Sequence, residues 1–225
     1  MNVFTSPVSL FTHWKIPYNR YAWFIITWLA MLTLFHNVKF ITTDMTLFDP
    51  DFREKYTLHW PMVMTHGVSA MLALAIGPIQ FLDSLRKRWR SLHRVFGRIY
   101  ILSIAFAAPT GFLMGIMAYG GILSQTAFML FAVLWLFTAY KGYETARKRD
   151  FSAHRVWMIR CYALTFGAVI IRIQLNLLLD LGFRYEDVYP YLPWSSWLPT
   201  LLFGEGIIRR WDAYLPQPVP MMKAG

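Results

Sequence analysis

Two histidine–arginine pairs are the side chains of this sequence best suited to holding a ligand. They are His93-Arg94 and His154-Arg155, and each stands between a run of basic residues and an apolar stretch. A neutral imidazole coordinates haem iron or another metal through one ring nitrogen. A guanidinium binds haem propionates, phosphates or a quinone carbonyl. The sequence therefore predicts a ligand site at the two pairs, with His93 and His154 as candidate ligands to a metal or haem iron.

The two pairs belong to an internal repeat, in which residues 86–103 match residues 147–165 with one residue inserted. Arg86, Lys87, Arg88, Ser91, His93, Arg94, Val95, Arg98, Tyr100 and Leu102 recur as Arg147, Lys148, Arg149, Ser152, His154, Arg155, Val156, Arg160, Tyr162 and Leu164. Both copies have the same direction, which predicts a parallel repeat of helix pairs about an axis along the membrane normal. The axis would place the two histidines at equal depth, with Arg98 and Arg160 as further cofactor-binding candidates.

The composition is that of a polytopic membrane protein. Of the 225 residues, 56% are hydrophobic, 18% aromatic and only 15% charged, which is too apolar for an ordinary soluble domain. We expect an all-α helical bundle in one transmembrane domain, residues 21–210, between an N-terminal segment with an interface anchor, 1–20, and a tail, 211–225. About six spans are expected, at 21–38, 61–82, 98–118, 123–140, 157–181 and 195–208. The repeat units are 61–118 and 123–181.

The last of these segments is the least regular. It holds fourteen residues and is interrupted by Pro199, Gly204 and Glu205, whereas a perpendicular span needs about 20 residues. We therefore expect either a short sixth span or a re-entrant segment.

The distribution of basic residues indicates how the chain lies in the membrane. The N-terminal segment, the two His-Arg loops with their helix starts and the C-terminal tail hold 17 of the 22 Lys and Arg residues, while the opposite loops hold four. The positive-inside rule then predicts a multi-pass protein of the bacterial inner membrane with both termini in the cytoplasm. The net charge of +10 is explained without nucleic acid. Expected partners are anionic lipid headgroups at these loops and other membrane subunits.

Ionisable side chains inside the predicted spans form a second group of candidates, because burying them in lipid is costly. His66 and Arg172 are expected about 8 and 14 Å below the outer ends of their spans, from a rise of about 1.5 Å per residue. Asn176 lies one turn from Arg172, and His36 lies near the outer end of the first span. These residues predict a polar site in the outer half of the membrane.

Glu205 is expected to have a structural role. Its depth predicts an ion pair with Arg160 or a contact with His154. Three further polar residues are interpreted as packing or interface residues: Gln80, Tyr100 and Tyr162.

The single cysteine, Cys161, excludes a disulfide framework and a covalently attached haem,. The chain contains no nucleophile–base set, phosphate-binding glycine loop or His/Cys cluster at zinc spacing, so hydrolytic chemistry is disfavoured. Whether the protein is an enzyme stays open.

Four segments resemble the signature of a widespread bacterial family of membrane proteins of unknown function. They are THGVSAMLALAIGPIQF (65–81), LHRVFGRIY (92–100), AHRVWMIRCYALTFGAVIIR (153–172) and WLPTLLFGEGIIRR (197–210). The resemblance covers roughly residues 61–210 and supports the fold and the site residues without implying a reaction. It implies as pattern positions His66, His93, Arg94, Gly97, Arg98, His154, Arg155, Trp157, Arg160, Tyr162, Arg172 and Glu205. Thr200 stands where the family pattern is expected to have Asn.

Three functions fit these features. A redox protein, or a subunit of a membrane energy-conversion complex, would use histidines at two depths to bind b-type haem, or would bind a quinone. A transporter of a small molecule or ion would use the parallel repeat and the embedded Arg172. A structural or assembly subunit would bind lipid phosphates or a membrane partner through the His-Arg corners. The first is the preferred hypothesis.

Overall fold

The fold is a bundle of helices, as the sequence predicts. The computed structural model describes residues 20–38, 41, 44 and 57–212, and this part of the chain contains no strand. The expectations for residues 1–19 and 213–225 lie outside the described residues. The helices are α1 (Arg20–Asn37), α3 (Trp60–Gln80), α4 (Asp83–Arg88), α5 (Arg90–Ile116), α6 (Gly121–Arg147), α7 (Phe151–Asp180), α8 (Tyr185–Val188) and α9 (Leu192–Asp212).

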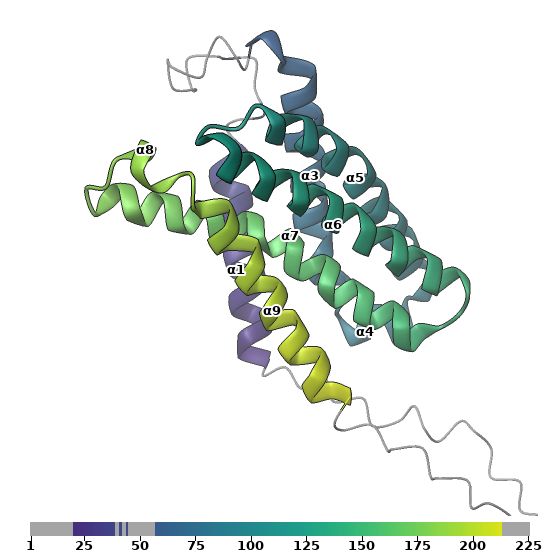
Figure 1. Cartoon of the computed structure of the whole chain (residues 1–225). Coiled ribbons are helices and arrows are strands. Elements are labelled where there is room, and N and C mark those ends of the chain that lie inside the picture. Colours follow the sequence, from purple (N-terminus) through teal and green to yellow (C-terminus); the bar gives the residue numbers. More distant parts are fainter. Residues whose placement is uncertain (1–19, 39–40, 42–43, 45–56, 213–225) are drawn as a thin grey trace, which may run out of the picture.

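The long helices pack side by side and bring the basic segments to one end of the molecule. Helix α5 packs between α3 and α6, α7 packs between α6 and α9, and α1 contacts α3 and α7 (Figure 1). The start of α1, α4, the turn between α6 and α7 and the end of α9 lie at the same end. We call this the basic end. Helix α8 and the turn between α5 and α6 lie at the opposite end.

Two predicted loops are largely helical, which corrects the expected span boundaries. The segment 83–97 forms α4 and the first two turns of α5, and α6 and α7 leave only 148–150 between them. Arg, Lys and Leu are good helix formers, so a change to basic composition shows where a helix leaves an apolar environment rather than where it ends. As a result the two histidines lie within helices instead of at loop boundaries.

Helix α9 is also longer than expected. It runs without interruption through Pro199 for 21 residues, so the expectation that Pro199, Gly204 and Glu205 break the segment is wrong. Gly204 is buried in the contact with α7, where an added Cβ would lie 3.1 Å from that of Ala163. Gly167 of α7 likewise lies directly against Trp197 of α9. These glycines allow α7 and α9 to approach closely.

A hydrogen-bonded cluster ties three helices together in the core. Thr165 of α7 accepts hydrogen bonds from Trp135 Nε1 of α6 at 2.9 Å and from the Tyr100 hydroxyl of α5 at 2.8 Å. The Thr165 hydroxyl in turn donates to the Cys161 carbonyl at 2.9 Å. All four residues are buried, and buried polar groups that are satisfied in this way specify how helices pack. The cluster fixes the positions of the helices that carry His93 and His154.

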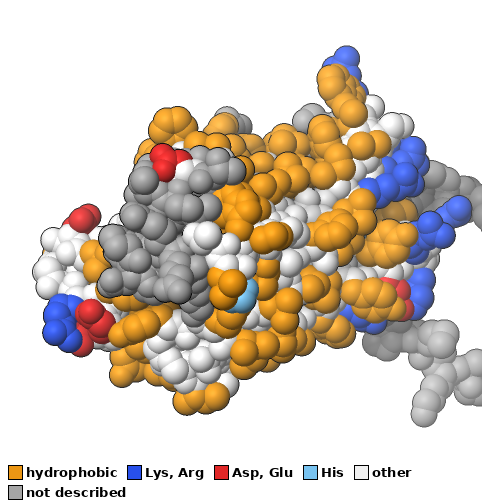
Figure 2. Space-filling model, turned by 90° about the horizontal axis from the view of Figure 1, so that it is seen from above, with side chains coloured by type: hydrophobic (Ala, Val, Ile, Leu, Met, Phe, Trp, Pro, Cys, Tyr) orange, Lys and Arg blue, Asp and Glu red, His pale blue; other side chains and the backbone are white. Residues whose placement is uncertain are grey.

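The surface is that of a membrane protein. Four helices, α3, α5, α6 and α7, are long and apolar enough to cross a membrane. Large apolar side chains such as Leu102 and Phe106 are about 60% exposed on α5, which is unfavourable in water and ordinary against lipid. Figure 2 shows a broad apolar surface with Lys and Arg gathered at one end. The six-span count and the repeat symmetry remain predictions.

Candidate functional site

The two repeated histidines occupy the same position in their helices. His93 is the fourth residue of α5 and His154 is the fourth residue of α7. The imidazole of His93 is within electrostatic reach of His154 and of Arg86 from α4. The structure therefore brings the two histidines into one region at the basic end. Helical packing of α5 and α7 against their neighbours, rather than a loop, holds them there.

The ring of His154 has a defined orientation. Its Nδ1 lies 2.7 Å from the main-chain carbonyl oxygen of Gly142 on α6. A carbonyl only accepts hydrogen bonds, so Nδ1 carries the proton and Nε2 keeps its lone pair. Histidines that ligate metals are commonly oriented by such a bond. Arg155, whose charge reaches the same imidazole, lies beside it.

His93 differs from His154 in its hydrogen bonding. Its Nδ1 is buried and has no hydrogen-bond partner within the described part of the chain. Two other side-chain atoms in this region share that property, Gln80 Nε2 and the Tyr162 hydroxyl. The interpretation of Gln80 and Tyr162 as packing residues overlooked their unpaired polar atoms. The sequence carries no signal for them, since the repeat has the same residue type at Tyr100 and Tyr162.

The repeated arginines do not form one cluster. Arg94 is exposed and donates to Ser91 at 3.4 Å, and Arg98 is exposed on α5. Arg160 instead binds Glu205 of α9, through Nε at 2.5 Å and Nη2 at 3.1 Å. The structure thus contains the pair expected for Glu205.

The outer polar residues are joined through α1, although not as expected. Arg172 donates from Nε to Asn37 Oδ1 at 2.9 Å and from Nη1 to the Ala168 carbonyl at 3.0 Å. Its charge reaches His66. His36, the neighbour of Asn37, is exposed, and Asn176 is exposed on α7. Asn37 therefore takes the position proposed for His36, because the helical turn points the adjacent side chain toward α7.

The ring of His66 fits into a gap between α3 and α5. Its Nδ1 lies 2.8 Å from the Ala107 carbonyl oxygen, so Nε2 keeps the lone pair here as well. Gly111 of α5 makes room for the ring, since a Cβ at that position would lie 2.8 Å from His66 Cε1. His66 and His154 are thus oriented by the same kind of bond.

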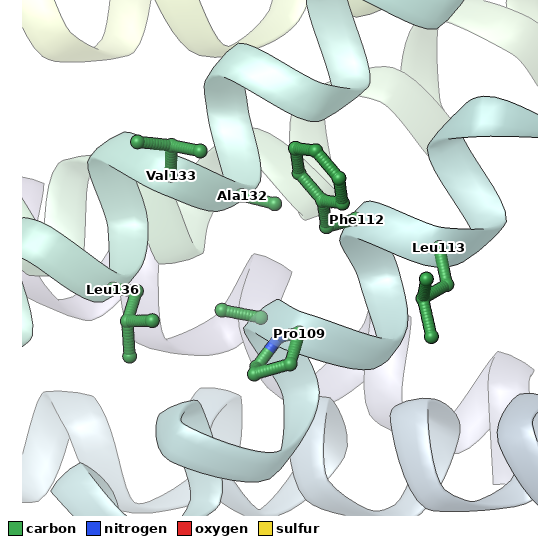
Figure 3. A pocket seen from close by; sticks show the side chains of 7 residues that line it. Pro109, Phe112, Leu113, Ala132, Val133 and Leu136 are labelled. Carbon is green, nitrogen blue, oxygen red and sulfur yellow. The ribbon is translucent and has the colours of Figure 1, made fainter.

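A separate apolar pocket of about 340 Å³ lies between α5 and α6, and none of the predicted site residues lines it. Its walls come from Ala108, Pro109, Phe112, Leu113, Ala132, Val133 and Leu136 (Figure 3). Within the described residues, no group of three or more His, Cys, Asp and Glu side chains is placed to hold a metal ion.

The chain belongs to the family described as predicted membrane protein (DUF2306), whose model matches residues 63–208. The match includes His66, both His-Arg pairs and the ion pair between Arg160 and Glu205. No curated protein and no solved structure matches the chain. Membership of this family agrees with the membrane protein expected from the sequence and assigns no activity.

Proposed function

We propose that the protein is a membrane electron-transfer protein that binds b-type haem at His66 and at His154. The observation that carries the proposal is shared by the two residues. Each donates Nδ1–H to a main-chain carbonyl of a neighbouring helix, at 2.8 and 2.7 Å, and so keeps Nε2 available for iron. The hydrogen bond fixes the ring and makes the free nitrogen a better ligand.

The chemistry of the surrounding side chains fits such a group. Haem, when bound, supplies one-electron redox chemistry. Near the basic end, Arg155 would bind its anionic propionates, and near the opposite end Arg172 would do so. Both charges already act on the corresponding histidine. The two histidines lie toward different ends of the spans, so electrons would pass between the two sides of the bilayer.

The direction in the membrane is part of the proposal. With the basic end in the cytoplasm of a bacterium, His154 would lie on the inner side and His66 on the outer side of the inner membrane. A complex subunit with a redox partner at either surface would suit this arrangement.

A second candidate, a structural or assembly subunit that binds anionic lipid, is favoured by the exposed basic residues. Nine basic side chains on the helix ends and the turn at the basic end are exposed: Lys87, Arg88, Arg90, Arg94, Arg147, Lys148, Arg149, Arg209 and Arg210. Clusters of this size bind anionic headgroups. This candidate needs no cofactor, so it makes a different prediction for the purified protein.

The discriminating experiment is an absorbance spectrum of the full chain purified in detergent, oxidised and then reduced with dithionite. The redox proposal predicts a Soret band that shifts on reduction. A protein expressed with haem supply that shows no Soret band would contradict it and leave the lipid-binding candidate.

A further inference from the structure

We infer that Gln80, His93 and Tyr162 form a binding site for the headgroup of a quinone at the basic end of the bundle. We call these three residues the donor cluster. The site is distinct from the Nε2 atoms assigned to haem. A quinone at this site would be the redox partner in the proposed electron transfer. The biological role of the site therefore rests on the proposed function, whereas quinone binding can be tested without it.

The first argument is the cost of leaving these groups unpaired. Gln80 and Tyr162 are 8% and 9% exposed, and the Nε2, Nδ1 and hydroxyl atoms of the cluster have no hydrogen-bond partner in the described part of the chain. A buried donor without a partner costs roughly 1–3 kcal/mol. Nearly all such groups in native proteins are paired with protein, water or ligand. Three unpaired polar atoms from three helices in one region indicate that a ligand supplies the missing hydrogen-bond partners,.

The second argument is that packing places the three residues together. The Tyr162 ring lies 5.5 Å from the Phe81 ring, centroid to centroid, beside Gln80 at the end of α3. The Gln80 carboxamide faces α5 at Gly97, 3.6 Å from where a Cβ would stand. Gly97 lies one turn after His93 on the same face of α5. The cluster therefore sits where α3, α5 and α7 meet.

Gly77 makes room for the Tyr162 ring in this region. A Cβ at Gly77 would lie 2.4 Å from Tyr162 Cε2, so only glycine accepts the tyrosine ring at its present position. The Tyr162 ring thus packs directly on the backbone of α3, whereas Gln80 lies at ordinary van der Waals distance from the position of a Cβ at Gly97.

The charges select the chemical class. Within the described part of the chain, two basic side chains, His154 and Arg86, lie within electrostatic reach of His93. A bare metal cation is therefore disfavoured. A neutral ligand with carbonyl oxygens accepts hydrogen bonds from the Gln80 amide and the Tyr162 hydroxyl. Its interaction with these donors and with the basic side chains strengthens when reduction places negative charge on the ligand oxygens. A quinone in the bilayer has these properties.

The test is the binding of decyl-ubiquinone to the full chain in detergent, followed by tryptophan fluorescence and corrected for partition into empty micelles. Tyr162→Phe and Gln80→Leu each remove one donor and should weaken binding about 3- to 10-fold, the equivalent of one hydrogen bond. Tyr100→Phe is the matched control, because this repeat-related hydroxyl is already bonded to Thr165. It should leave binding unchanged.

The outcomes separate this inference from the haem proposal. Quinone binding that depends on Tyr162 and Gln80 in a protein without a Soret band would support the site and remove the haem. Wild-type affinity in both variants would overturn the site even if haem is present. Displacement of the quinone by dilute phosphatidylglycerol would also overturn it, because the cluster would then be a phosphate site.

Discussion

Tyr100 and Tyr162 are equivalent residues of the sequence repeat, yet only the hydroxyl of Tyr100 has a hydrogen-bond partner in the described structure. Tyr100 lies in the core cluster with Thr165, whereas Tyr162 lies against Gly77 with its hydroxyl unpaired. The two copies of the repeat therefore have the same residue at this position in different roles. Tyr100 packs in the core, and Tyr162 is available to bind a ligand.

This difference predicts opposite effects of the same substitution on stability. Tyr100→Phe should lower the free energy of unfolding by about 1–2 kcal/mol, because it removes the buried hydrogen bond from the Tyr100 hydroxyl to Thr165,. Tyr162→Phe should leave it unchanged or raise it by up to about 1–3 kcal/mol in quinone-free protein, because no hydrogen bond is lost and a buried unpaired hydroxyl is removed,. Thermal or denaturant unfolding in detergent measures both. A larger loss in Tyr162→Phe than in Tyr100→Phe would contradict the assignment.

The ion pair between Arg160 and Glu205 is predicted to hold α9 against α7. Glu205→Gln should destabilise the protein by about 1–3 kcal/mol, because the carboxylate charge and at least one of the two bonds to the guanidinium are lost. The matched control is Glu186→Gln near α8, whose partner Arg184 is exposed. Exposed pairs contribute about 0–1 kcal/mol. Unfolding followed by circular dichroism compares the two variants. Equal losses in the free energy of unfolding would contradict a larger contribution from the pair between Arg160 and Glu205.

Gly111 is predicted to be required for the position of His66. A methyl group there would lie 2.8 Å from the imidazole, so Gly111→Ala should displace the ring and cost about 1–3 kcal/mol of overpacking. Gly67→Ala on α3 is the control, because an added Cβ meets nothing within 4 Å there and should be neutral or stabilising. Proteolysis rates and unfolding midpoints report the difference. Two variants with the same stability would contradict the tight fit at Gly111.

The helical bundle and the pairing of the two histidines were predictable because both follow from patterns. Hydrophobic runs define the long helices, and the repeat assigns His93 and His154 equivalent helix positions. Helix ends at 83–97 were misplaced because basic residues continue a helix as well as apolar ones do. The sequence pattern placed His36 rather than Asn37 in the outer polar site, because a difference of one residue decides which side chain of α1 faces α7.

The donor cluster could not be predicted from the sequence. Gln80 is an ordinary polar residue at a helix end, and only the packing of α3 against α5 at Gly97 shows that it is buried. The unpaired state of Tyr162 is likewise a property of three helices together. Such sites depend on contacts between elements distant in the chain, which periodicity and spacing do not encode.

The most direct test of the central claim is the haem content per chain, measured as the pyridine haemochrome in the wild-type protein and in single variants. We predict two haems per chain in the wild type, loss of one in His66→Ala and of the other in His154→Ala, and retention of both in His36→Ala, whose side chain is exposed. Full haem content in His66→Ala and His154→Ala, or no haem in the wild type, would contradict the assignment of these histidines.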